Sequence, residues 1–222
     1  MLTPYGKREW LVILGLALAA SAACVFMQLW WGAGVVIVLT LVLLSFFRDP
    51  PRRIPTESGA MASPADGLIS SIHEVRDESP LGAPAVCIRI FLSVLDVHVN
   101  RIPCDGRIVS LTPKPGRYLS ALNPRSAEEN ETLTLVMQHP TEPRLIAAVR
   151  QVSGLIARRI VCAAKVGDSL KCGERYGMIK FGSTTELYLP LSLQPKVLVQ
   201  KGQRVWGGST ILATVSNIPP QR

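Results

Sequence analysis

The chain is poor in the residues that build metal sites and disulfide frameworks. It has three histidines and five cysteines, and no two cysteines are spaced as a CxxC pair. This usage predicts buried or free thiols in a reducing compartment. The histidines, His73, His98 and His139, are scattered without metal-ligand spacing, so we expect no metal. Aromatic and basic residues do not alternate as they do on a nucleic-acid platform, and we expect no nucleic-acid partner.

Charge is absent from one long stretch. Residues 10–47 contain no Asp, Glu, Lys or Arg, and this run is nearly twice the ~20 residues that a membrane-spanning helix needs. The motif WWGAG at residues 30–34 interrupts it, and tryptophan prefers the membrane interface. We therefore expect a transmembrane helical hairpin within residues 1–50, with spans at about 10–28 and 33–47.

Basic residues flank the uncharged run on both sides. Lys7 and Arg8 precede it, and three arginines follow between positions 48 and 53. The positive-inside rule then predicts that both ends, and the domain that follows, are cytoplasmic. Two alternatives stay open: a signal peptide with a cleavage or lipidation site at Cys24, and a re-entrant hairpin confined to one leaflet.

The rest of the chain has the pattern of a β-rich α+β domain. Residues 51–62 are a charged, proline-rich linker, and residues 63–222 alternate short apolar segments with glycine turns. We expect one helix at residues 116–122 and a loop at 126–131. After residue 50 the chain carries 21 basic and 14 acidic residues, a balance that suits an anionic membrane surface.

Two pairs of similar segments lie within this domain. SPADGLISSI at position 63 is similar to IPCDGRIVSL at 102, and VGDSLKCGERYGMI at 166 is similar to KGQRVWGGSTILATV at 201. Paired β units of this kind resemble the barrel-sandwich folds of biotinyl and lipoyl carrier domains. We therefore expect a barrel-sandwich-like domain behind the hairpin.

A Gly-Ser dipeptide, Gly182–Ser183, lies in the segment KFGSTTELYLP. Glycine has no Cβ to block approach to its carbonyl carbon, so the Ser183 hydroxyl could attack it and turn the amide into an ester. Loss of that ester by β-elimination would lead to a pyruvoyl group, a ketone that can serve as an electron sink. Most Gly-Ser dipeptides are plain turns, so the surrounding residues must show whether this one is reactive.

Those residues resemble a known family. QVSGLIARRIVC, KVGD and GERYGMIKFGSTTELYLP, with SPADG, LDVHVNRIP and GRYLSALNPRSAEENE upstream, resemble phosphatidylserine decarboxylase proenzymes of the short bacterial and archaeal type, from about Phe47 onward. The resemblance implies a carboxy-lyase that converts phosphatidylserine to phosphatidylethanolamine in phospholipid biosynthesis. It also implies self-cleavage into residues 1–182 (β chain) and 183–222 (α chain), which stay associated, with a covalent pyruvoyl cofactor made from Ser183 that forms a Schiff base with the substrate.

The resemblance also implies the remaining site residues. His98 in LDVHVNRIP would be the base, and Asp66 in SPADG the carboxylate that orients it. Asp96 stays an alternative to Asp66, since on a strand it would share a face with His98. Longer bacterial members carry a second histidine where this chain has Arg101, which leaves open whether His98 acts in both cleavage and catalysis. The candidates for binding the lipid phosphate are Arg101, Arg158, Arg159 and Lys165.

The expected location is the bacterial inner membrane, with the catalytic domain on the cytoplasmic side; the oligomeric state is left open. Two rival functions fit parts of the pattern. A membrane-anchored adaptor would pair an N-terminal span with lipoyl-like β units, but its long coiled-coil hairpin is missing. A membrane-tethered serine protease would use Ser183 with His98 or Lys165 as base. Whether the chain is split after Gly182 discriminates among them.

Overall fold

The computed structural model describes residues 1–76, 79–120, 123, 125–154, 160–180 and 183–216. The chain forms two compact units, Met1–Pro50 and Pro51–Arg222. Each unit has its own secondary structure: helices in the first, and almost only β-strands in the second.

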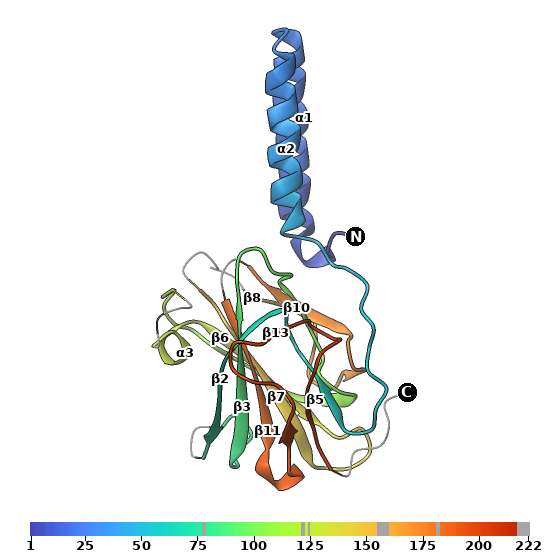
Figure 1. Ribbon diagram of the computed structural model, residues 1–222, viewed down its shortest axis with the longest axis vertical. Helices are drawn as coiled ribbons and strands as arrows, with labels where there is room; N and C mark the ends of the chain where they lie inside the picture. Colours follow the sequence, from blue (N-terminus) through green and yellow to red (C-terminus); the bar gives the residue numbers. More distant parts are fainter. Residues whose placement is uncertain (77–78, 121–122, 124, 155–159, 181–182, 217–222) are drawn as a thin grey trace. The chain divides into compact units, whose positions relative to one another are not determined.

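The first unit is a pair of apolar helices, α1 (Lys7–Phe26) and α2 (Trp30–Ser45), which lie side by side (Figure 1). Neither helix has a buried residue, as expected for helices that are apolar on all sides and have no core to pack against. In the described part of the chain one segment, Pro4–Phe26, is long and apolar enough to cross a membrane, and α2 is apolar but shorter.

The turn between the helices lies at Met27–Leu29, and not within the WWGAG motif. Gln28 has a positive φ of 61°, which ends α1 before the tryptophans are reached. The glycines of the motif lie inside α2, and a Cβ at Gly32 would be only 3.2 Å from Cys24 Sγ. The missing side chain therefore lets the start of α2 approach α1 closely.

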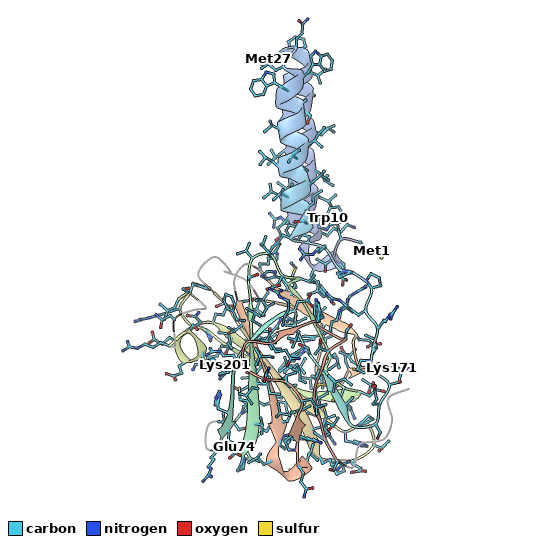
Figure 2. The ribbon with its side chains drawn as sticks, in the orientation of Figure 1. Met1, Trp10, Met27, Glu74, Lys171 and Lys201 are labelled. Carbon is cyan, nitrogen blue, oxygen red and sulfur yellow. The ribbon has the colours of Figure 1, made fainter. Side chains whose placement is uncertain are left out.

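Hydrogen bonds close the other end of the helix pair. Thr3 N donates to Phe47 O at 2.8 Å, and Trp10 Nε1 donates to Thr3 O at 3.1 Å. A Cβ at Gly6 would collide with the Phe47 ring, so only glycine fits there. Figure 2 shows Trp10 and Met27 toward opposite ends of the helix pair.

The second unit is built around an eight-stranded antiparallel sheet of order β13-β2-β3-β11-β7-β6-β5-β9, curled into a half-barrel (Figure 1). Two three-stranded sheets, β4-β10-β8 and β1-β14-β12, complete it. The β-rich expectation is thus confirmed. The strands are β1 (Ala60–Ala62), β2 (Gly67–Val75), β3 (Ala85–Leu92), β4 (Val99–Arg101), β5 (Gly106–Lys114), β6 (Thr132–Gln138), β7 (Leu145–Val152), β8 (Ile160–Cys162), β9 (Ser169–Leu170), β10 (Arg175–Ile179), β11 (Ser183–Pro190), β12 (Lys196–Val197), β13 (Arg204–Val205) and β14 (Ile211–Thr214).

One hydrophobic core joins the three sheets. It contains Ile90 and Leu187 from the large sheet, Tyr176 from β10, and Met61 and Leu212 from the β1-β14 pair, all at most 1% exposed. Burying an aliphatic side chain of this size contributes about 1.5–3 kcal/mol. The small sheets therefore pack against one face of the half-barrel, and residues between them are removed from water.

The two pairs of similar segments occupy equivalent positions at the two edges of the large sheet. β13 pairs with β2 and β9 pairs with β5, each through two residues. Asp66 Oδ1 accepts from Gly207 N at 2.7 Å, and Asp105 Oδ1 accepts from Cys172 N at 2.8 Å. The sequence repeat is therefore a structural repeat, in which each Asp-Gly turn is bonded to a glycine-containing turn.

The helix expected at residues 116–122 is wrong for the residues the structure describes. Residues 116–120 are not helical, and a short helix, α3 (Ser126–Glu129), lies where a loop was expected. Asn130 explains the difference: its side chain accepts from Leu119 N at 2.8 Å and donates to Leu119 O at 2.9 Å. Backbone groups that bond to a distant side chain in this way are not available for a helix.

Candidate active site

Ser183 is the first residue of β11, which lies in the middle of the large sheet between β3 and β7. Its side chain is fully buried, and its Oγ has no hydrogen-bond partner among the residues that the structure describes. A buried hydroxyl without a partner costs free energy and calls for an explanation, and a reactive role is one such explanation. Gly182, whose carbonyl carbon would be attacked, lies outside the described residues.

The opposite face of β11 holds the strand in place. Glu186, whose side chain is 3% exposed, lies 3.2 Å from Arg89 Nε on β3 and 2.6 Å from Arg150 Nε on β7. Its Oε2 also accepts from Tyr188 OH at 2.7 Å. One arginine from each neighbouring strand thus shares the same buried carboxylate, which fixes β11, and with it Ser183, within the sheet.

Asn100 on β4 connects three other segments at the same buried place. Its Nδ2 donates to Thr185 Oγ1 at 3.1 Å and lies 3.3 Å from Pro64 O, and its Oδ1 accepts from Gln151 Nε2 at 2.8 Å. Because side chains alternate along a strand, Thr185 shares a face of β11 with Ser183. Asn100 therefore ties the SPADG segment and β7 to the strand that begins with Ser183.

Replacing Asn100 by alanine is expected to lower the free energy of unfolding by about 2–4 kcal/mol, because three buried groups lose their partner. Chemical denaturation of the full chain in detergent, in a Ser183→Ala background so that one uncut species is compared, measures the change. The control is Asn123→Ala, since Asn123 is exposed; its cost is expected to stay below about 1 kcal/mol. Equal costs for the two variants would show that the Asn100 contacts contribute nothing special.

His98 lies two residues before Asn100 and is fully buried. Its Nδ1 lies 2.9 Å from the main-chain oxygen of Asp96. A carbonyl oxygen can only accept, so Nδ1 carries the proton of the neutral imidazole and Nε2 carries the lone pair. The ring is therefore oriented by its own backbone, and Nε2 is the atom that can accept a proton.

Two connections bring His98 and Ser183 to the same part of the unit. The main-chain oxygen of His98 accepts from Ile179 N at 3.2 Å, and Ile179 precedes Ser183 by four residues, at most about 14 Å of extended chain. In addition, Asn100, two residues after His98, contacts Thr185, two residues after Ser183. His98 is thus tied, through Ile179 and through Asn100, to the segments on either side of Ser183.

Asp66 has both carboxylate oxygens engaged. Oδ1 accepts from Gly207 N at 2.7 Å, and Oδ2 accepts from Arg52 Nη2 at 2.8 Å. Burial raises the pKa of Asp66, while the Arg52 charge and the two hydrogen bonds oppose that rise. Its bond to Gly207 is the counterpart of the Asp105 bond in the repeat, whereas the Arg52 contact is additional.

The carboxylate of Asp96 is also engaged. Its Oδ2 accepts from Ser93 N and Ser93 Oγ, both at 2.8 Å, and its Oδ1 accepts from Arg204 at 2.6 Å. Although burial acts against it, these hydrogen bonds and the Arg204 charge lower the pKa of Asp96. Asp96 therefore reaches His98 through its main-chain oxygen, while its carboxylate holds the turn before the histidine.

Comparison with known proteins identifies the family of the chain. The family model described as "Phosphatidylserine decarboxylase" matches residues 39–213. The chain belongs to this family. The phosphatidylserine decarboxylase proenzyme of Ehrlichia chaffeensis is 44% identical over 201 residues, covering 90% of this chain and 88% of that protein. Those of Carboxydothermus hydrogenoformans and Cupriavidus pinatubonensis are 43% and 39% identical, covering 96% of this chain and 97% and 95% of the respective relatives.

In this phosphatidylserine decarboxylase family member, the basic residues singled out in the sequence have different surroundings. Arg101 is buried, and its Nη1 donates to Gly173 O at 2.9 Å. Lys165 is exposed in the segment between β8 and β9. Arg158 and Arg159 lie outside the described residues. Arg101 thus contributes at least one contact within the fold, while Lys165 is open to solvent.

Sequence reasoning missed two residues that the structure brings to this region of the decarboxylase. Asn100 stands in the LDVHVNRIP segment, where a buried asparagine between apolar residues was a usable signal. Arg52 stands in the linker, where a charged residue is expected to be solvated. Only the folded chain shows that its side chain is 9% exposed and paired with Asp66.

Proposed function

We propose that this chain cuts itself between Gly182 and Ser183, and that the cut protein decarboxylates phosphatidylserine to phosphatidylethanolamine and carbon dioxide. Family membership supports the reaction. The observation that carries the proposal is the Ser183 hydroxyl, buried at the start of a central strand and without a partner among the described residues. Such a hydroxyl can rotate toward the preceding carbonyl without breaking a hydrogen bond.

Ser183 is the nucleophile of the cleavage and His98 is its base. Oγ attacks the carbonyl carbon of Gly182 while its proton passes to His98 Nε2. The C–N bond breaks, the nitrogen of residue 183 takes the proton, and an ester joins Gly182 to Oγ. Loss of the Cα proton of residue 183 then expels the Gly182 carboxylate, and hydrolysis with release of ammonia leaves a pyruvoyl group at position 183.

The carboxylate of the site is assigned to Asp66, with Asp96 as the alternative. Asp66 stands in the SPADG segment, whose Pro64 carbonyl oxygen lies 3.3 Å from Asn100 Nδ2, two residues from His98. Asp96 lies nearer in sequence, but its carboxylate is occupied by Ser93 and Arg204. A buried negative charge in this region favours the protonated form of the imidazole after it has taken the serine proton.

The pyruvoyl group supplies an electron sink that no standard side chain provides, which is what loss of carbon dioxide from an amino-acid headgroup requires. His98 then acts a second time, because its Nε2 carries the proton that replaces the lost carboxyl group on carbon. The lipid phosphate is bound by one of the basic residues Arg101, Arg158, Arg159 and Lys165. Lys165, which is exposed, has its ammonium group open to a headgroup.

The two fragments stay together after cleavage. β11 belongs to the short fragment and pairs with β3 and β7 of the long one. β14 likewise lies between β12 and β1, of which only β1 belongs to the long fragment. A fragment of this size cannot bury a core alone, so the paired strands of this barrel-sandwich-like domain hold it in place.

We also assign α1 and α2 to a transmembrane hairpin in the bacterial inner membrane, with the β-rich domain on the cytoplasmic side. Lys7 and Arg8 at the start of α1 and Arg48 after α2 carry positive charge at the same end of the helix pair, as the positive-inside rule requires. A diacyl lipid leaves the bilayer only at a large cost in hydrophobic free energy, so an anchored enzyme meets its substrate where it is concentrated.

The test is an intact mass of the full chain, purified in detergent, together with its activity on phosphatidylserine vesicles. We expect two chains that part after Gly182, the smaller one lighter than its serine-started sequence by the mass of one ammonia, and release of carbon dioxide from the vesicles. A single uncut chain that releases carbon dioxide would overturn self-cleavage. An uncut and inactive chain would overturn the whole proposal and favour an adaptor.

A further inference from the structure

The linker between the two units contains an arginine whose side chain is mostly buried. Arg52 Nη2 lies 2.8 Å from Asp66 Oδ2, and both side chains are only 9% exposed. The next residue, Arg53, is exposed. Two adjacent arginines thus have opposite surroundings, and the buried one pairs with the carboxylate proposed for the site.

Ile54, two residues after Arg52, packs on two turns in the same part of the fold. A Cβ at Gly173 would collide with the Ile54 side chain, and a Cβ at Gly208 would lie 3.4 Å from Ile54 Cδ1. Both glycines have positive φ, 77° and 74°, and they occupy the two equivalent turns of the repeat. The linker therefore lies against these turns near Asp66 instead of extending freely into solvent.

The repeat shows that the Arg52 contact is not needed to form the turn. Asp105 is the counterpart of Asp66, and the partner described for its carboxylate is the N–H of Cys172 alone. Asp66 has the same kind of bond, to Gly207, and Arg52 in addition. The extra pair is therefore found only in the half of the repeat that contains the site, which points to a role in the chemistry.

We propose that Arg52 is a positioning residue for the self-cleavage: from the linker, its guanidinium fixes the Asp66 carboxylate in the site. The inference rests on the proposed function, since it depends on the role of Asp66 in that reaction. It adds that the segment following the helices is a working part of the site.

Four charged groups surround Asp66 or its immediate neighbours. Arg52 faces Asp66 from the linker. The negative charge of Asp96, in the turn before His98, raises the pKa of Asp66. Arg204 on β13 is paired with Asp96, and Arg101 on β4 donates to Gly173 O. Without Arg52, burial and Asp96 are opposed only by the Gly207 bond, so the pKa of Asp66 rises and its carboxyl protonates at a higher pH.

The experiment measures self-cleavage of newly synthesised full-length chain in lipid nanodiscs, from about pH 5.5 to about pH 8.5. Arg52→Ala is expected to slow cleavage about tenfold or more at the acid end and less at the alkaline end, because a carboxyl with a higher pKa is ionised in fewer molecules at low pH. Arg52→Lys is expected to restore most of the rate. Arg53→Ala, the matched exposed neighbour, is expected to behave as wild type.

A double variant tests whether Arg52 acts through Asp66. Asp66→Asn and Arg52→Ala/Asp66→Asn are expected to cleave at the same rate, because Arg52 has no carboxylate left to hold. If Arg52→Ala has the rate and the pH profile of Arg53→Ala, the proposal is overturned. If Arg52→Ala does not fold, Arg52→Gln is used, and a wild-type pH profile for that variant overturns it equally.

A wild-type chain that stays uncut would count against the proposed function and not by itself against the pairing. In that case thermal unfolding of the uncut chain gives the answer for Arg52. The two single variants and the double variant are then compared. Additive shifts in the unfolding temperature would contradict a coupling between Arg52 and Asp66, and a clear departure from additivity would support it.

Discussion

Ser183→Ala is expected to give a single uncut chain with no decarboxylase activity. Alanine has no hydroxyl to attack the Gly182 carbonyl, and without cleavage no pyruvoyl group forms. Because Ser183 Oγ has no partner among the described residues, the change removes no hydrogen bond known to hold the fold. The free energy of unfolding should therefore be unchanged or raised by up to about 1 kcal/mol. Intact mass and denaturation in detergent measure both effects.

Ser153→Ala is the matched control for this variant. Ser153 is also fully buried, and its Oγ likewise has no partner in the described part of the chain. It is expected to be cut like wild type, which would show that loss of a buried hydroxyl does not by itself stop cleavage. A Ser183→Ala chain that still parts after Gly182 would contradict the assigned nucleophile.

His98→Asn is expected to slow self-cleavage by about 10²–10⁴-fold, the usual contribution of a positioned general base. The asparagine amide can still donate to the Asp96 main-chain oxygen, as Nδ1 does now, but it has no atom in the place of Nε2 that can take a proton. The variant therefore keeps the local hydrogen bond and removes the base. Cleavage is followed on denaturing gels after synthesis of the full chain in nanodiscs.

The chain supplies its own control for this substitution. His73 lies exposed on β2, so His73→Ala is expected to be cut at the wild-type rate and to unfold at the wild-type temperature. Thermal unfolding of His98→Asn establishes that it is folded. A folded His98→Asn chain that is cut as fast as His73→Ala would mean that another group accepts the serine proton.

Features carried by local patterns could be predicted from the sequence. The uncharged run forms two apolar helices, and the repeated Asp-Gly segments form equivalent strand pairs. The helices depend on residues close in sequence, whereas the strand pairs join distant segments that the sequence repeat marks as equivalent. The family resemblance, carried by motifs such as SPADG and LDVHVNRIP, is confirmed by the match over residues 39–213.

Features that depend on distant partners could not be predicted. Within residues 116–120, both backbone polar groups of Leu119 are bonded to the Asn130 side chain, which a helix rule based on neighbours cannot anticipate. The pairing of Arg52 with Asp66 joins a linker to a turn, and Arg52 and Arg53 have the same side chain and nearly the same position in the sequence. Only the contacts made on folding decide which of the two is buried.

The place of β11 in the sheet has a consequence for the life of the molecule. Its pairing with β3 and β7 forms while the chain is continuous. At that stage folding is unimolecular, because all three strands belong to one chain. After the proposed cleavage, an unfolded molecule would be two separate chains, and reassembly would cost the translational and rotational freedom of one of them, about 4–15 kcal/mol. Folding then becomes a one-time event, and the lifetime of the mature protein depends on how slowly it unfolds.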